Sequence, residues 1–116
     1  MSDSQGTGSL FASGERVYIS GPISLDGRAT PGEIEANMQA FHDYAARLTA
    51  AGCIPLSPLD NGLDPSSSWE DHMRADIGML TEAHEIHMLP RWQESRGSTL
   101  EMFIATQIGV KVRTAS

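Results

Sequence analysis

The alternation of short apolar runs with longer amphipathic stretches constrains this chain more than any other feature of its sequence. Strands are expected at residues 17–20, 54–56, 85–89 and 110–113, with helices of 3.6-residue periodicity between them. This alternation predicts a parallel sheet with helices on both faces and right-handed crossovers. We therefore expect an α/β fold, a small doubly wound sheet of the flavodoxin- or Rossmann-like kind, with four strands in the order 2-1-3-4.

Local signals mark where the first two helices begin. Thr30, Pro31 and Glu33 combine an N-cap, a proline at the first helical position and the glutamate of a capping box. Ser68, or the serine before it, caps the second helix. Pro55 lies within the second strand, which predicts that this strand is at an edge of the sheet.

Length and composition predict a single soluble domain. The chain has 116 residues, of which 40% are hydrophobic and 20% charged, which suits one core. We assign residues 15–116 to this domain and residues 1–14, rich in serine and glycine, to a flexible tail. The formal net charge of −7 argues against binding a nucleic-acid polymer. No apolar run has the length of a membrane span.

Cys53 is the only cysteine. An internal disulfide is therefore excluded, and a reducing, cytoplasmic location is expected. Its apolar neighbours indicate a small core residue rather than a nucleophile.

Glu101 is a carboxylate on a helical face that should be apolar. Ala105 and Ile108 follow it by four and seven residues, so all three share the face expected to pack on the sheet. Burying a carboxylate is costly unless it is paired or has a task. Two interpretations stay open: Ser98 and Glu101 form a capping box at the helix start, or Glu101 is catalytic.

Asp76 is a second carboxylate at an apolar position. It lies in mid-helix on one stripe with Trp69, Met73 and Leu80, where Asp is a poor helix former. It is either a boundary residue paired with Arg74 or a backbone amide, or a functional group in the cleft. Two inward carboxylates suit displacement at a sugar anomeric carbon, where one attacks or stabilises positive charge and the other handles protons.

Two polar loops follow the first and third strands, where ligands bind in folds of this type. The first begins Ser20-Gly21-Pro22-Ile23, and its backbone amides either hold phosphate or ribose hydroxyls or merely form a tight turn. The second covers residues 90–97 and leads into the helix of Glu101.

The aromatic residues near these loops have two interpretations each. Tyr18 points its hydroxyl into the cleft or its ring into the core, and Trp69 and Trp92 stack on a nucleobase or belong to the core or an interface. The four histidines give no set of three convergent ligands, so we predict neither a metal nor a cofactor.

Several segments form, in order, a pattern that spans residues 17–112. It consists of residues 18–23, Asn37, Phe41, Leu48, Gly52, Pro58, residues 68–77, residues 89–98 and Glu101. This pattern resembles the nucleoside 2-deoxyribosyltransferase family, in particular its compact single-domain bacterial and phage forms and the related 2′-deoxynucleoside 5′-phosphate N-hydrolases.

The resemblance implies an enzyme that cleaves or transfers the N-glycosidic bond of a (deoxy)nucleoside or nucleoside 5′-monophosphate. Glu101 matches the nucleophile that attacks C1′, and Asp76 matches a supporting acid at the sugar or the leaving base. Ser95 and Gly97 match a turn that faces the 5′-phosphate in the hydrolase branch. A helix N-terminus favours an ionised Glu101, whereas burial disfavours it.

The implied ligand is a small nucleoside or nucleotide, and the implied assembly is a homo-oligomer, a dimer or larger. The expected substrate-binding residues are Tyr18, Ser20, Gly21, Pro22, Ile23, Trp69, Met73, Arg91, Trp92, Ser95 and Gly97.

The chain departs from the family pattern at three positions. His84 stands where the family usually has Asp, Arg91 where it has Gly, and Glu94 where it has Asn. Arg91 either binds a phosphate or covers the mouth of the cleft. The alternative function is a non-catalytic module that binds a nucleotide or nucleotide-derived molecule, and a structural or interaction role is the third class.

Overall fold

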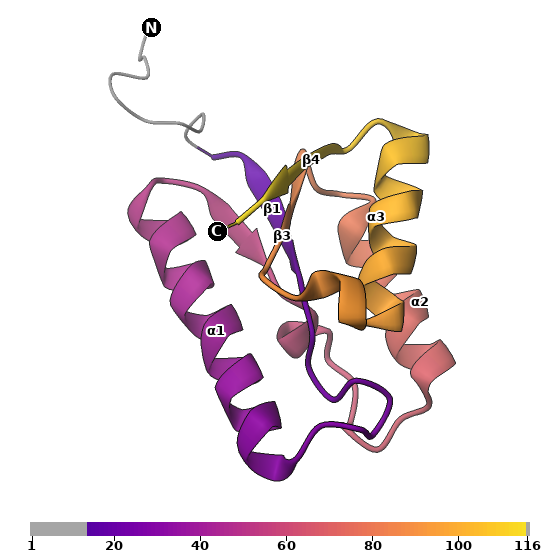
Figure 1. Cartoon of the computed structure of the whole chain (residues 1–116). Helices are drawn as coiled ribbons and strands as arrows, with labels where there is room; N and C mark the ends of the chain where they lie inside the picture. The colour runs from indigo at the N-terminus through magenta and orange to yellow at the C-terminus, as the bar shows by residue number, and fades with distance from the viewer. Residues whose placement is uncertain (1–13, 116) are drawn as a thin grey trace, which may run out of the picture.

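A computed structural model describes residues 14–115 of the chain, and the predicted tail lies, apart from Gly14, outside the described residues. The strands are β1 (Arg16–Ser20), β2 (Ile54–Leu56), β3 (Glu85–Met88) and β4 (Lys111–Thr114). They form one parallel sheet in the order β2-β1-β3-β4, which confirms the predicted fold class and strand order (Figure 1).

Three helices cover the two faces of this sheet. They are α1 (Pro31–Ala50), α2 (Trp69–Leu80) and α3 (Arg96–Ile108), with the single-turn helices η1 (Pro58–Asp60) and η2 (Trp92–Glu94) in the connections. Helix α1 packs on one face, and α2 and α3 lie together on the other (Figure 1). No helix in the described part of the chain is long and apolar enough to cross a membrane.

The alternation of side chains along β1 divides the core between the two faces. Val17 and Ile19 pack with the α1 layer, whose buried cluster also contains Cys53. Tyr18 points the other way, into the cluster shared with α2 and α3. Cys53 is 4% exposed, which confirms its assignment to the core. Pro55 lies on the edge strand β2, as predicted.

The predicted starts of α1 and α2 are confirmed. Thr30 and Glu33 form a reciprocal capping box with Pro31 in the first turn. The Ser68 hydroxyl accepts a hydrogen bond from the backbone N–H of Asp71 at the start of α2.

Of the two interpretations of Glu101, the capping box with Ser98 is wrong. The cap is Ser95, whose hydroxyl accepts from the backbone N–H of Ser98 at 3.2 Å, so the helix begins at Arg96. Ser98 is therefore already inside the helix. Glu101 is the sixth helical residue, too far along to close the first turn.

The predicted burial of Ile108 is also wrong, because its side chain is 50% exposed. The buried face of α3 ends at Ala105. Gly109 then ends the helix with a φ of 81°, and Val110, the next residue, belongs to the buried cluster on this side of the sheet.

Candidate active site

A cavity of about 600 Å³ opens at the C-terminal ends of the central strands, where the topology predicts a ligand site. Its walls come from the loop after β1, the start of α1, the segment 58–67 and the N-terminal turns of α2 and α3. Ser20 pairs with Met88 at the end of β1 and β3, so the two following loops leave the sheet side by side. A Cβ on Gly21 would lie 2.9 Å from that of Leu89, so glycine is required for this close approach.

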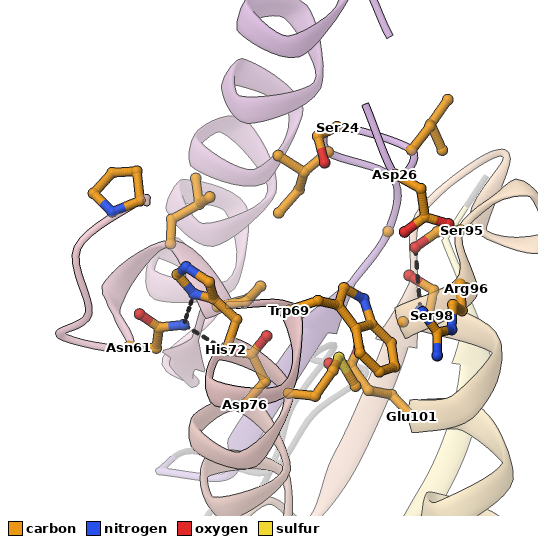
Figure 2. A pocket seen from close by; sticks show the side chains of 18 of the residues that line it. Ser24, Asp26, Asn61, Trp69, His72, Asp76, Ser95, Arg96, Ser98 and Glu101 are labelled. Atoms are coloured by element: carbon orange, nitrogen blue, oxygen red, sulfur yellow. Dashed lines mark hydrogen bonds between the residues drawn. The ribbon is translucent and has the colours of Figure 1, made fainter. Parts of the chain in front are cut away.

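Glu101 lies at the floor of this cavity and is 4% exposed (Figure 2). The Tyr18 hydroxyl donates to Oε2 at 2.8 Å, and the Ser20 hydroxyl donates to Oε1 at 2.6 Å. Both donors are fully buried residues of β1. The carboxylate is therefore held by one hydroxyl on each oxygen, and it plays no part in capping its helix.

Tyr18 contributes both its ring to the core and its hydroxyl to the cleft. Its ring packs in the core against Leu80 and Ile86, while its hydroxyl reaches Glu101. Burial raises the pKa of Tyr18 well above its ordinary value, and the negative charges of Glu101 and Asp76 raise it further. Tyr18 therefore stays protonated and acts as a donor.

Burial decides the charge state of Glu101. Desolvation raises its pKa from 4.5 to about 7, against the lowering effect of the Ser20 and Tyr18 hydrogen bonds, and the charge of Asp76 raises it as well. The helix dipole acts mainly within the first turn, which ends before this residue. Near neutral pH the carboxyl is thus divided between its acid and its base form.

Asp76 faces the same cavity from the middle of α2 and is 7% exposed. Its Oδ1 accepts a hydrogen bond from Asn61 Nδ2 at 2.9 Å. Burial raises the pKa of Asp76, and the Asn61 bond and the charge of His72 oppose this effect. Within residues 14–115 no ion pair links Asp76 to Arg74, so the boundary interpretation of Asp76 is not supported.

Asn61 and His72 complete a polar wall that the sequence analysis did not assign to the site. Asn61 Nδ2 lies 3.0 Å from His72 Nδ1, and Asn61 Oδ1 accepts from the backbone N–H of Leu63. The four-residue spacing of His72 and Asp76 places them on one helical face. No pattern in the sequence links Asn61 to that face.

The N-terminal turn of α3 forms the opposite wall, with Ser95, Gly97 and Ser98. A Cβ on Gly97 would lie 3.1 Å from the sulfur of Met73, so a larger residue would displace this buried side chain. The Arg96 guanidinium lies over the Trp69 ring, 3.7 Å from its centroid. Arg96 therefore covers one face of the ring, and only the other can stack on a ligand.

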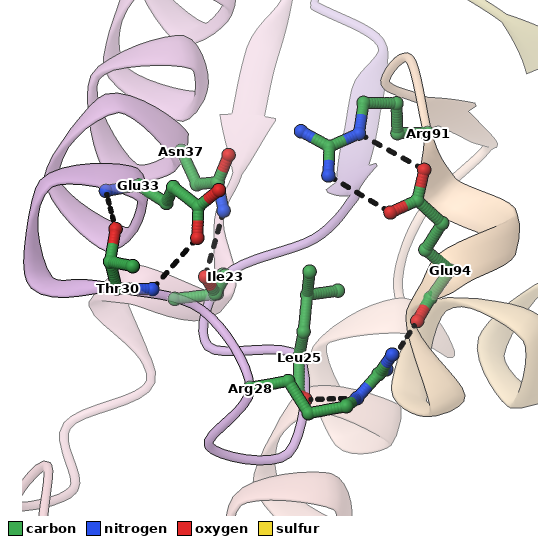
Figure 3. A network of polar contacts seen from close by, with 8 residues as sticks. All are labelled: Ile23, Leu25, Arg28, Thr30, Glu33, Asn37, Arg91 and Glu94. Atoms are coloured by element: carbon green, nitrogen blue, oxygen red, sulfur yellow. Dashed lines mark hydrogen bonds and ion pairs between the residues drawn. The ribbon is translucent and has the colours of Figure 1, made fainter.

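Three expected substrate-binding residues, Pro22, Arg91 and Trp92, are not among the residues that line the cavity. Trp92 instead packs against the core beneath α3. Arg91 is exposed and pairs with Glu94 through two hydrogen bonds of 3.0 and 2.9 Å (Figure 3). Tyr18 and Ser20 do not line the cavity either, but their hydroxyls donate hydrogen bonds to Glu101, which does. The remaining expected residues all line the cavity.

The departures from the family pattern have local explanations. Arg91 adopts a φ of 68°, a conformation that glycine adopts more readily. Glu94 compensates by binding the Arg91 guanidinium and by accepting, through its carbonyl, a hydrogen bond from Arg28. His84 Nδ1 accepts from the backbone N–H of Arg16 at 3.0 Å, a role that an Asp carboxylate also fills.

The loop after β1 is anchored from α1. The Asn37 amide donates to the carbonyl of Ile23 at 2.8 Å (Figure 3). Ile23 in turn lines the cavity and packs against the α1 layer. Across the residues that the structure describes, no three His, Cys, Asp or Glu side chains converge in a way that would hold a metal ion.

Two solved structures have a fold similar to that of this chain. A 2-deoxyribosyltransferase from the psychrotolerant bacterium Bacillus psychrosaccharolyticus is similar with a TM-score of 0.63 and 14% identity, covering 85% of this chain and 70% of its own. A 2-deoxyribosyltransferase from Leishmania mexicana gives a TM-score of 0.62 and 19% identity, covering 86% of this chain and 63% of its own. The chain thus has a nucleoside 2-deoxyribosyltransferase-like fold, as the sequence motifs predicted.

The chain belongs to the family described as the domain of unknown function DUF4406, whose model matches residues 15–114. Among curated proteins there is no match.

Proposed function

We propose that this protein cleaves or transfers the N-glycosidic bond of a (deoxy)nucleoside or its 5′-monophosphate, with Glu101 as the nucleophile. One observation carries the proposal. Glu101 is a carboxylate at the floor of a cavity, held by two neutral hydroxyls and bonded to no cation within the described residues. A buried carboxylate without a charged partner is costly, and such cost is typical of functional sites.

The first step is displacement at C1′. One oxygen of Glu101 attacks C1′ of the sugar as the bond to the base nitrogen breaks, and the electron pair of that bond leaves with the base. The product is a glycosyl ester on Glu101. The hydroxyls of Tyr18 and Ser20 orient the carboxylate and leave a lone pair on each oxygen free for attack.

Asp76 handles the proton of this step. Burial raises the pKa of Asp76, which favours the acid form that donates a proton to the departing base. In the second step the ionised Asp76 takes a proton from an incoming water, or from a second base, that attacks C1′ and releases Glu101. The order of roles follows microscopic reversibility.

The two ends of the cavity suit the two parts of a nucleoside. The N-terminal turn of α3 offers the hydroxyls of Ser95 and Ser98 and the backbone N–H groups of Arg96 and Gly97, which suit the sugar hydroxyls or a 5′-phosphate. The opposite end is lined by Pro58, Leu59 and Leu63, which suit the flat apolar faces of a base.

A homo-oligomer remains part of the proposal. Phe103 and Ile108 on α3 are 61% and 50% exposed, and large apolar side chains of this kind favour contact with a second copy. Light scattering at two protein concentrations measures this directly, and a monomer at both would contradict it.

Base release tests the catalytic proposal. The protein is incubated with deoxynucleosides and their 5′-monophosphates, and free base is measured by chromatography. We expect release from at least one member, and loss of that release in Glu101→Ala. Retention of one intact ligand with no release from any member would favour a binding module instead.

A further inference from the structure

The amide of Asn61 can adopt only one orientation. The backbone N–H of Leu63 donates to its Oδ1 at 3.0 Å, and its Nδ2 lies 2.9 Å from Oδ1 of Asp76. A flipped amide would set two donors together at Leu63 and two acceptors together at Asp76. The Asn61 nitrogen is therefore also the group that lies 3.0 Å from Nδ1 of His72.

This orientation fixes the tautomer of His72. The second hydrogen of the Asn61 amide points at Nδ1, which must accept it and therefore carries no proton. In the neutral ring the proton then lies on Nε2. Nε2 makes no hydrogen bond to any residue between 14 and 115, and the half-buried ring lines the cavity (Figure 2). His72 thus offers an N–H donor to a ligand.

The position of His72 assigns that donor to the base. His72 precedes Asp76 by about one helical turn, about 6 Å along α2 toward the N-terminus of the helix. Its wall continues into Pro58, Leu59 and Leu63, the apolar end of the cavity. Under the proposed function the sugar hydroxyls lie at the opposite wall, formed by residues 95–98.

We propose that His72 reads the exocyclic group of the base and selects 6-oxopurines and 4-oxopyrimidines over their amino counterparts. This inference rests on the proposed function, which places C1′ at Glu101. A base bound there carries its 4- or 6-substituent on the edge away from the sugar. A carbonyl at that edge accepts from Nε2–H, whereas an amino group sets two donors against each other.

Two matched pairs of substrates test the selection. Deoxyinosine with deoxyadenosine, and deoxyuridine with deoxycytidine, differ at this edge of the base. We expect kcat/KM to favour the oxo member of at least one pair by about 10-fold or more. His72→Leu should bring the ratio near one, chiefly by raising KM for the oxo member. His72→Gln should also bring it near one, because a glutamine amide rotates to donate or to accept.

His42→Leu is the matched control, because His42 is exposed on α1 and does not line the cavity. Its oxo-to-amino ratio should equal that of the unaltered protein. Equal or better use of the amino members by the unaltered protein would overturn the proposal. A ratio that survives in His72→Leu would overturn it as well.

Binding without turnover separates this inference from the catalytic proposal. Titration calorimetry of Glu101→Gln with the same four nucleosides should give the same preference in Kd. If the unaltered protein releases no base but Glu101→Gln binds the oxo members more tightly, the catalytic proposal is wrong and base selection by His72 is supported. If base is released equally from the oxo and amino members, the catalytic proposal is supported and base selection by His72 is wrong.

The tautomer has a spectroscopic test of its own. In ¹⁵N–¹H spectra of the full chain at pH 8, the ring of His72 should carry its proton on Nε2. Asn61→Leu removes the amide donor and should bring the ring to a mixture of tautomers. An Nδ1–H tautomer in the unaltered protein would contradict the proposal.

Discussion

Two glutamates are buried against the same sheet, on opposite faces and in opposite electrostatic settings. Glu101 lies on the α3 side, and within residues 14–115 its only side-chain partners are the hydroxyls of Tyr18 and Ser20. Glu85, on the α1 side, accepts from Arg113 and contacts His87, each at 2.9 Å. The two side chains are only 4% and 6% exposed, but Glu101 lies deeper in the protein than Glu85, so desolvation acts more strongly on Glu101.

Their pKa values differ in direction. Burial raises the pKa of both carboxyls, but the hydrogen bonds and charges of His87 and Arg113 outweigh it at Glu85, whose pKa is lowered. At Glu101 the two hydroxyls do not outweigh burial, and its pKa rises to about 7. The comparison shows that depth of burial and charged partners together decide in which direction the pKa of a buried carboxylate moves.

The largest expected difference between the two is in activity. Glu101→Gln should lower the rate of base release on the order of 10³-fold or more, because it removes the proposed nucleophile. Glu85→Gln is the matched control on the other face and should keep most of the rate. Single-turnover assays with saturating substrate measure both. Equal losses in the two variants would place the effect in folding rather than in chemistry.

The second difference is in stability, because the two Glu→Gln substitutions should change the free energy of unfolding in opposite directions. A folded-state pKa raised from 4.5 to about 7 means that stability falls as pH rises through this window, by roughly 3 kcal/mol in all. Glu101→Gln should therefore stabilise the protein by up to about that amount at pH 8. This advantage should disappear below pH 4.5, where the unaltered carboxyl is protonated in both states.

Glu85→Gln should instead destabilise the protein at pH 8, by about 1–3 kcal/mol, because it breaks a buried charged contact. Since the pKa of Glu85 is lowered, its contribution is present above pH 4.5 and lost as pH falls below that value. Urea denaturation at pH 8 and pH 4 separates the two glutamates. A stability gain in both variants would contradict the comparison.

The third difference is in the pH profile. If Glu101 attacks as the carboxylate, kcat/KM rises with pH through about 7. Tyr18→Phe removes a hydrogen bond that lowers the pKa of Glu101, so the midpoint of the rise should move to higher pH. Tyr44→Phe is the control, because its hydroxyl contacts His87 on the opposite face. A shift in the control but not in Tyr18→Phe would refute this assignment.

The smallest expected effect is at Arg91, which touches neither glutamate. Arg91→Gly relieves a φ of 68°, which glycine adopts without strain, and loses an exposed ion pair with Glu94, which solvent screens. These two effects oppose each other, so the midpoint of urea denaturation should change little, and base release should be unchanged. A large loss of activity would place Arg91 at the site after all.

The fold was predictable because the periodicity of the sequence sets it. Val17–Ser20 and the other strands follow from apolar runs bounded by turn residues, and the Thr30 capping box is a local signal. Ile108 was misplaced because periodicity alone does not reveal that Val110 returns to the core after Gly109.

The site was predictable only in part. Glu101 and Asp76 could be singled out because carboxylates interrupt apolar stripes. Their partners could not, because the contact of Tyr18 with Glu101 joins residues 83 positions apart. Asn61 lies in a polar loop where an amide is unremarkable in sequence, and only its contact with Asp76 gives it a role.

The central claim is that the Glu101 carboxylate forms a covalent ester with the sugar. The most direct test is intact-protein mass spectrometry after an acid quench during turnover of a deoxynucleoside, followed by peptide mapping. We expect an added mass of one deoxyribosyl group on the peptide that contains Glu101, and no such adduct in Glu101→Gln. Base release without any adduct, at a rate that Glu101→Gln retains, would contradict the account.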